Sequence, residues 1–286
     1  MRRIGIIMLV LASAALAGCT SLPQIGMSGG EGTTAARGVV IQEASYNDSI
    51  IPEGGATWLI LRFKNTNPAP IEKLNADLSN LGLLTADLKR SSSGGEGCDF
   101  KGLRAASPDL SPPQKLCMWK LSAGKNAEGV YPVTLTLNHT TSLLMQKETP
   151  KFSFVRDPGK VQKKSRAYSN GEMALTVSFR STHDMGAGTI EVDLTVRNAG
   201  KGSIGQIKGD RKVKLSYSGS LTDIFNAKTE CKKIFIPEGE RSETMTCKIS
   251  KIKGKSPQAG TSYNLRIDMR YNYERRLELP LKVSAD

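Results

Sequence analysis

The sequence predicts an all-β protein in which two β-sandwich domains follow each other, each stapled by one disulfide. Three observations lead to this prediction. Short alternating apolar segments are separated by turn residues, four cysteines fall into two local pairs, and a repeat relates the two halves of the chain.

The strand prediction rests on segments of five to nine residues rich in Val, Ile, Leu, Thr and Tyr. They include WLILRF, VYPVTLTLN, IEVDLTVRN, VKLSY and YNLRIDMRY. Clusters of Pro, Gly and Asn separate them, as expected for turns. Beyond the first twenty residues, no stretch offers a long apolar face of helical period. Short strands at this spacing favour an immunoglobulin-like sandwich over a barrel.

An internal duplication is the best explanation of the second half of the chain. At an offset of about 132 residues, three features align in the same order: LILRFKN (59–65) with VDLTVRN (192–198), Cys98 with Cys231, and the strand led by Tyr131 with that led by Tyr263. Each copy has the size of one domain. We therefore expect one sandwich over residues 37–157 and a second over 158–286, with the boundary in a polar, turn-rich stretch.

The four cysteines downstream of residue 19 lie as one local pair in each repeat. In a secreted protein an even count indicates disulfides, so we expect Cys98–Cys117 and Cys231–Cys247. Closing loops of this size contributes about 3 kcal/mol each by the chain-entropy argument. A zinc site is the alternative, but no pair has CxxC spacing, and the chain contains only two histidines.

The first residues have the pattern of a secretion signal. Arg2 and Arg3 precede an apolar run, Ile4 to Leu16, which is shorter than the ~20 residues that span a bilayer. The run ends in Leu16-Ala17-Gly18-Cys19, which resembles the lipobox of prokaryotic lipoproteins. The alternative is an ordinary signal peptide followed by a chance cysteine.

The lipobox resemblance implies that residues 1–18 are cleaved and that Cys19 becomes a lipidated first residue. Residues 19–36, rich in Gly, Ser and Thr, would then form a flexible tether. The chain would be membrane-anchored and extracytoplasmic, at an outer membrane or cell surface. Thr20 after the cysteine resembles the outer-membrane sorting pattern, if the cell has two membranes.

The strands that end in Asn67-Pro68 and Asn198-Ala199-Gly200 resemble those of CARDB-type adhesion modules, which are immunoglobulin-like. This resemblance covers about ten residues per copy, and the disulfides depart from a plain module of that kind. It implies a sandwich used for adhesion at a microbial surface.

Positive charge is concentrated in the second repeat. Residues 158–286 hold 24 Lys and Arg against 14 Asp and Glu, a net charge of +10, whereas residues 20–157 hold 14 against 13. The basic character favours an anionic partner. The residues that we expect to bind it are Arg211, Lys212, Lys214, Lys251 and Lys253. The alternative is a solvated surface in which lysines blunt the edge strands.

Motifs that look catalytic lack their required context. The GxSxG match at 26–30 lies in the tether, without the strand and helix of a nucleophile elbow. The GxGxxG match at 200–205 follows a strand but precedes a β-like segment, so we expect a turn rather than a phosphate loop. His139 and His183 lack partners at metal-ligand spacing, and we expect both at the surface or in turns.

Two tryptophans and two asparagines each allow more than one interpretation. Trp58 and Trp119 fall on or beside strands, where core packing is favoured over a sugar-binding platform. Asn47 and Asn138 begin N-glycosylation sequons, which matter only in a host with that machinery.

These observations favour a non-enzymatic, membrane-anchored binding or adhesion module for an envelope component, without metal or cofactor. The expected partner is a protein or an anionic glycan or lipid; nucleic acid is disfavoured without being excluded. The alternative is a structural subunit or spacer of a secretion, pilus or envelope-spanning assembly, and an enzyme is the least favoured class.

Overall fold

A computed structural model describes residues 38–93, 97–107, 109–145, 148–204, 212–237 and 240–285. The predicted signal peptide 1–18, the tether 19–36 and Cys19 lie outside the described residues. The described chain is all-β, as predicted, with only two short 3-10 helices, η2 (Ser220–Asp223) and η3 (Thr229–Lys232). Its strands belong to one compact unit, Ala35–Asp286.

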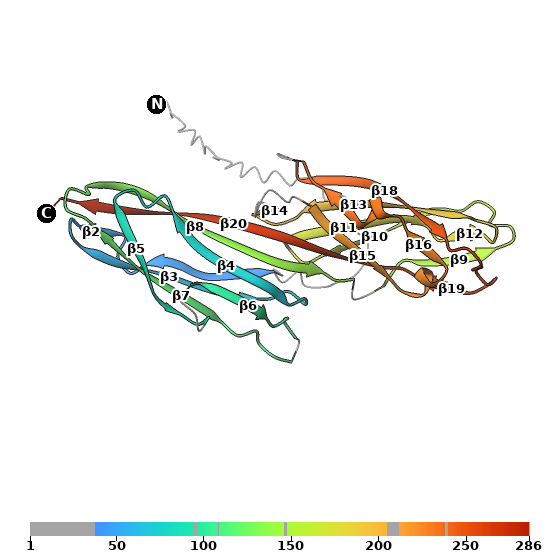
Figure 1. Cartoon of the computed structure of the whole chain (residues 1–286), viewed down its shortest axis with the longest axis horizontal. Coiled ribbons are helices and arrows are strands. Elements are labelled where there is room, and N and C mark those ends of the chain that lie inside the picture. The colour runs from blue at the N-terminus through green and yellow to red at the C-terminus, as the bar shows by residue number, and fades with distance from the viewer. Residues whose placement is uncertain are drawn as a thin grey trace, which may run out of the picture. The chain divides into compact units, whose positions relative to one another are not determined.

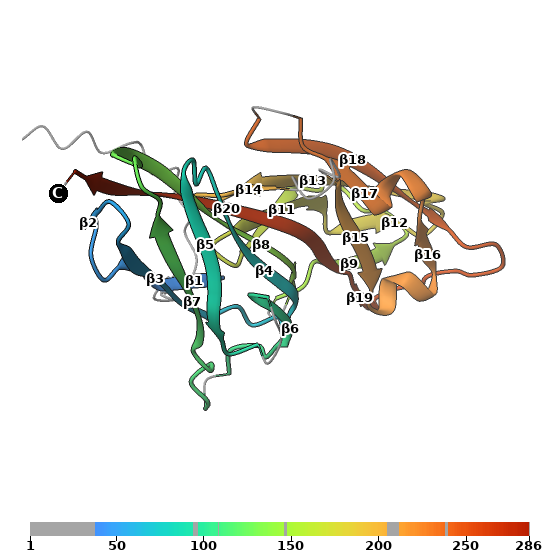
Figure 2. The ribbon, with the colours of Figure 1, turned by 60° about the vertical axis from the view of Figure 1, so that its left-hand side comes forward.

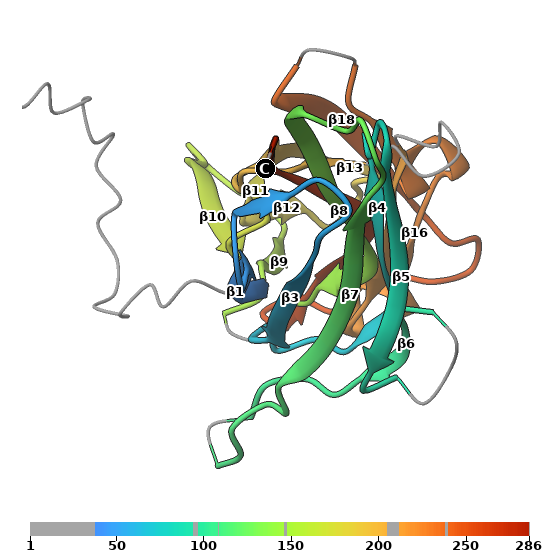
Figure 3. The ribbon, with the colours of Figure 1, turned by 90° about the vertical axis from the view of Figure 1, so that its left-hand side faces the viewer.

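The first repeat contains a four-stranded antiparallel sheet, whose strand order is visible in Figure 3. In that order its strands are β1 (Val39–Tyr46), β3 (Ala56–Asn65), β7 (Lys115–Ala123) and β5 (Leu84–Ser91). The alternation of β3 explains its place, because Leu59, Leu61 and Phe63 are fully buried on one side of the strand.

The second repeat contains the matching sheet with one added edge strand. In order its strands are β10 (Lys163–Ser169), β11 (Met173–Arg180), β13 (Thr189–Asn198), β18 (Ser242–Lys251) and β16 (Phe225–Ala227). A small sheet accompanies it, made of β12 (Thr182–Asp184), β9 (Lys151–Val155) and β19 (Ser262–Asn264).

An eight-stranded sheet serves both repeats, so the two sandwiches share one layer (Figure 2). Its main path is β17 (Lys233–Phe235), β15 (Lys212–Ser218), β20 (Arg266–Ser284), β8 (Gly129–Leu143), β4 (Ile71–Ser79) and β6 (Asp99–Leu103). Two short strands, β2 (Ile50–Pro52) and β14 (Ser203–Ile204), also pair with β20. Figure 1 shows β8 and β20 side by side along their length.

The last strand of each repeat completes the core of the other repeat. Leu281 and Val283, near the end of β20, are buried with β3 and β7 of the first repeat. Phe152 and Phe154 of β9 are buried with β11 and β13 of the second repeat. The predicted domain limits, 37–157 and 158–286, follow the sequence repeat. The hydrophobic cores do not follow these limits, because each core includes the final strand of the other repeat.

The exchange is symmetric about the Thr140–Asn272 pair of the β8–β20 ladder. Thr140 and Asn272 are repeat equivalents, and they face each other in the ladder, where the Thr140 hydroxyl donates to the Asn272 side-chain oxygen at 2.6 Å. His139 pairs with Tyr273, and the equivalent pair is Tyr271 with Thr141. A local two-fold axis therefore relates the repeats.

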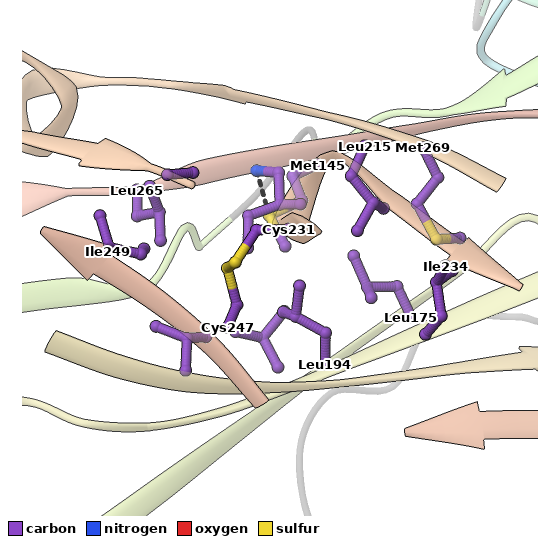
Figure 4. Packing of buried hydrophobic residues seen from close by; sticks show 14 of the residues in the cluster. Met145, Leu175, Leu194, Leu215, Cys231, Ile234, Cys247, Ile249, Leu265 and Met269 are labelled. Carbon is purple, nitrogen blue, oxygen red and sulfur yellow. Dashed lines mark hydrogen bonds between the residues drawn. A yellow bond between two sulfur atoms is a disulfide. The ribbon is translucent and has the colours of Figure 1, made fainter. Parts of the chain in front are cut away.

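Both predicted disulfides are present, and each links one sheet to a segment that directly precedes a strand of the eight-stranded sheet. Cys98 precedes β6 and bonds to Cys117 on β7, while Cys231 in η3 bonds to Cys247 on β18. Figure 4 shows the second bond inside its core, close to Met145 from the first repeat.

Candidate binding surfaces

The basic residues predicted to bind a partner do not gather into one patch. Lys214 is exposed on β15, in the eight-stranded sheet, and Lys212 is on the same strand. Lys251 ends β18, in the five-stranded sheet, and Lys253 is exposed in the turn that follows. Arg211 lies outside the described residues. Their role in binding stays a prediction, and the structure divides the described members between two layers.

The glycine motif near residue 200 is explained by packing. A side chain at Gly200 would place a Cβ atom 2.2 Å from the Tyr273 hydroxyl, and one at Gly202 would lie equally close to the Glu274 carbonyl oxygen. The following residues form strand β14 against β20 rather than a helix. Glycine is therefore needed for close approach of the loop to β20, and the segment 200–204 has no helix N-terminus for a phosphate.

The prediction that His139 lies at the surface is wrong. Its side chain is inside the junction between the repeats, because β8 continues past the predicted end of the strand to pair with β20. His139 Nε2 lies 3.1 Å from a Glu172 carboxylate oxygen. The Tyr271 hydroxyl donates to the same oxygen at 3.2 Å, and the Val39 N–H donates to the other at 2.9 Å.

This buried cluster joins the start of β1 to the start of β11. Val39 is the first residue of β1, and Glu172 immediately precedes β11. Burial raises the pKa of the Glu172 carboxyl, but the charge of His139 and the hydrogen bonds to the carboxylate outweigh it and hold the pKa below its usual range. The Asn170 amide donates to Tyr271 at 2.6 Å. These hydrogen bonds connect residues of both repeats, so the cluster stabilises the junction between them.

A different surface lies on the four-stranded sheet. We call its outward-facing quartet, Trp58 and Ile60 on β3 with Leu116 and Met118 on β7, the apolar face. Ile60 lies opposite Met118 in the ladder, and the other two residues are two positions away on the same side of their strands. All four side chains are half-exposed, and none belongs to either hydrophobic core.

The two tryptophans thus face opposite sides of this sheet. Trp119 is buried in the core that contains the Cys98–Cys117 disulfide, so its predicted core packing is confirmed. For Trp58 that prediction is wrong: the preceding and following residues, Thr57 and Leu59, point inward, and the pleat turns Trp58 outward.

The second repeat provides an internal comparison for the apolar face. On the same outward face of the matching strands it carries Glu191 and Asp193 on β13 and Thr246 and Lys248 on β18. These side chains are exposed or half-exposed, and the Thr246 hydroxyl donates to Asp193 at 2.7 Å. The same fold therefore forms with polar residues here, so the sandwich does not require an apolar set in the first repeat.

Basic side chains surround the apolar face. Arg62 pairs with Glu43 of β1 at 3.0 Å, and Asp87 of β5 pairs with Lys89. Three further cations border the quartet and form no ion pair among the described residues: Lys64, Lys120 and Arg90. Arg90 lies opposite Met118, and Lys120 lies opposite Trp58. The rim is therefore positive overall.

Neither a metal-ligand group nor a membrane-spanning helix is found in the described part of the chain. No group of three or more His, Cys, Asp or Glu side chains there could hold a metal ion. None of the helices within the described ranges is long and apolar enough to cross a membrane.

Comparisons with known proteins give little further guidance. No protein-family model and no curated protein matches the sequence. Among solved structures, a collagen adhesin from S. aureus aligns over 86% of this chain and 92% of its own, at 8% identity and a TM-score of 0.19. A structure described as manganese lipoxygenase of Gaeumannomyces graminis with partial zonadhesin of Komagataella pastoris covers 85% and 94%, at 11% identity and a TM-score of 0.15. Scores this low carry no argument about function.

Proposed function

We propose that the chain is a non-enzymatic binding module, held at a membrane by a lipid on Cys19, and that its apolar face contacts an envelope component. The supporting observation is the difference between the repeats. Equivalent outward positions are apolar in the first repeat and polar in the second. Contiguous, half-buried apolar side chains on an outward face, which the fold does not require there, favour an interaction surface.

The proposal predicts which substitutions separate binding from folding. The variant W58E/I60D/L116T/M118K gives the first repeat the side chains that the second repeat carries on the outward face of β13 and β18. We expect it to unfold at nearly the same temperature as the natural chain and to lose the envelope component that co-purifies with it. The matched control, E191Q/K248Q, alters the same face of the second repeat and should keep that component.

The measurement is thermal unfolding of the purified variants, together with quantitative analysis of the proteins, lipids and glycans recovered with each from solubilised envelopes. Retention of every component by a folded four-residue variant would contradict the proposal.

One observation favours a second candidate, a structural subunit or spacer of an envelope assembly. The shared sheet and the exchanged strands tie the two sandwiches together by continuous β-pairing, which suits a load-bearing part. Loss of an assembled machine on deletion of the chain, with normal assembly in the apolar-face variant, would favour this candidate.

A further inference from the structure

The residue types at the apolar face are those found at the centres of protein–protein contacts. Trp, Met and Arg are enriched in such centres, and a few of them supply most of the binding energy. Here Trp58 and Met118 lie within the quartet, and Arg62 and Arg90 are their neighbours on the same sheet. The inference below rests on the proposed function and specifies the partner of this surface.

The charge of the rim selects among possible partners. Lys64, Lys120 and Arg90 are cations without ion-pair partners in the described structure. Two copies of the chain joined through this surface would bring these like charges together, which costs binding free energy. A partner with acidic side chains around its contact site would instead pair with them.

The partial burial of the four apolar side chains argues against a lipid bilayer as the partner. A peripheral protein that lies in the interface buries its apolar side chains about 5–10 Å into the headgroup region. The quartet cannot reach that far, because its side chains are half-buried among their neighbours on a pleated sheet.

A glycan is also a poor match, since sugar recognition needs polar groups placed to bind hydroxyls beside the stacking ring. Lys120 is the polar side chain directly opposite Trp58 in the ladder, and the neighbours of Trp58 within the quartet, Ile60 and then Met118, are apolar.

We infer that the partner is a protein whose contact site has an apolar centre and an acidic rim. The area available places the contact in a size class of interfaces. Four strands ~4.8 Å apart, each rising ~3.4 Å per residue over about nine residues, present on the order of 500 Å². This is below the ~800 Å² per partner of a standard interface, so the contact is weak or transient and is best captured covalently.

The test uses the full chain in its own cells, with a photoreactive phenylalanine analogue in place of Ile60 or, as the matched control, in place of Asp193. The expected result is one protein adduct from position 60 and none from 193, with Asp and Glu in excess around the crosslinked peptide. The adduct yield should fall roughly tenfold when K64E/K120E is added, and should not change with K214E, which reverses an exposed charge in the other layer.

Four results would overturn the inference: an adduct with a second copy of the chain, adducts with lipid or glycan only, an unchanged yield in K64E/K120E, or no adduct at position 60. The proposed function is judged separately. It survives if W58E/I60D/L116T/M118K still loses an envelope component, and it fails with the inference if that variant loses nothing.

Discussion

Replacing Leu281 by alanine tests the strand exchange, because this residue belongs to the second repeat in sequence and to the first repeat in packing. Its side chain is fully buried in the core formed by β3, β4 and β7. A buried Leu→Ala change of this kind costs about 2–5 kcal/mol from lost burial and the cavity left behind. At about 3 kcal/mol, a chain of this size should unfold roughly 6–12 °C lower.

The location of the damage is more informative than its size. Native-state hydrogen exchange read by mass spectrometry reports local opening strand by strand. We expect L281A to accelerate exchange in β3 and β7 while β11 and β13 stay protected. The control is L265A, a leucine equally buried and also in the second repeat, but packed in the other core. It should give the opposite pattern. Faster amide hydrogen exchange in β11 and β13 of L281A would refute the conclusion that each core takes its final strand from the other repeat.

Three other predictions concern the junction, the disulfides and the anchor. Because the folded-state pKa of Glu172 is lowered, its contribution to stability is present above the ordinary glutamate value of about 4.3 and is lost as the pH falls through the folded pKa. Denaturant unfolding should therefore show that E172Q is about 1–3 kcal/mol less stable than the natural chain at pH 7, and this difference in unfolding free energy should become smaller below pH 4. A difference that does not change with pH would contradict the interpretation that the Glu172 carboxylate is ionised. Intact mass should rise by about 4 Da on full reduction, since each of the two disulfides releases two hydrogens, and unfolding free energy should fall by about 3 kcal/mol per bond; four free thiols before reduction would exclude both bonds. Replacing Cys19 by Ala should move the chain out of the membrane fraction on cell fractionation, and a chain that still pellets would rule out the lipobox.

Much of the fold follows from local sequence signals. Alternation, turn residues and the repeat predict the strands, and both cysteine pairs are bonded as expected. The exchange of final strands could not be predicted this way. In a duplicated sequence, β8 and β20 carry equivalent apolar patterns, and pairing within or between repeats buries the same residue types. The unusual lengths of these strands, Gly129–Leu143 and Arg266–Ser284, are the structural sign that each runs from one core into the other.

The candidate surface was missed although its signal is in the sequence. Trp58 and Ile60 alternate with Leu59 and Leu61, so one face of that strand had to point outward. When the two repeats are aligned at this strand, Glu191 matches Trp58 and Asp193 matches Ile60, so acidic residues in the second repeat replace apolar residues in the first. By contrast, net charge drew attention to the second repeat, but charge alone does not show which basic side chains share a surface. Burial of His139 depended on the β8–β20 pairing and had no local signal.

Oxidative footprinting of Trp58 and Met118 tests most directly whether the apolar face is covered in the cell. Both side chains react readily with hydroxyl radicals when solvent reaches them, and Met185, half-buried in the second repeat, provides the internal reference. The proposed contact predicts that both residues are oxidised in the purified chain and protected in intact cells, while Met185 is oxidised equally in the two samples. Equal oxidation of Trp58 and Met118 in cells and in the purified chain would show that nothing binds this surface.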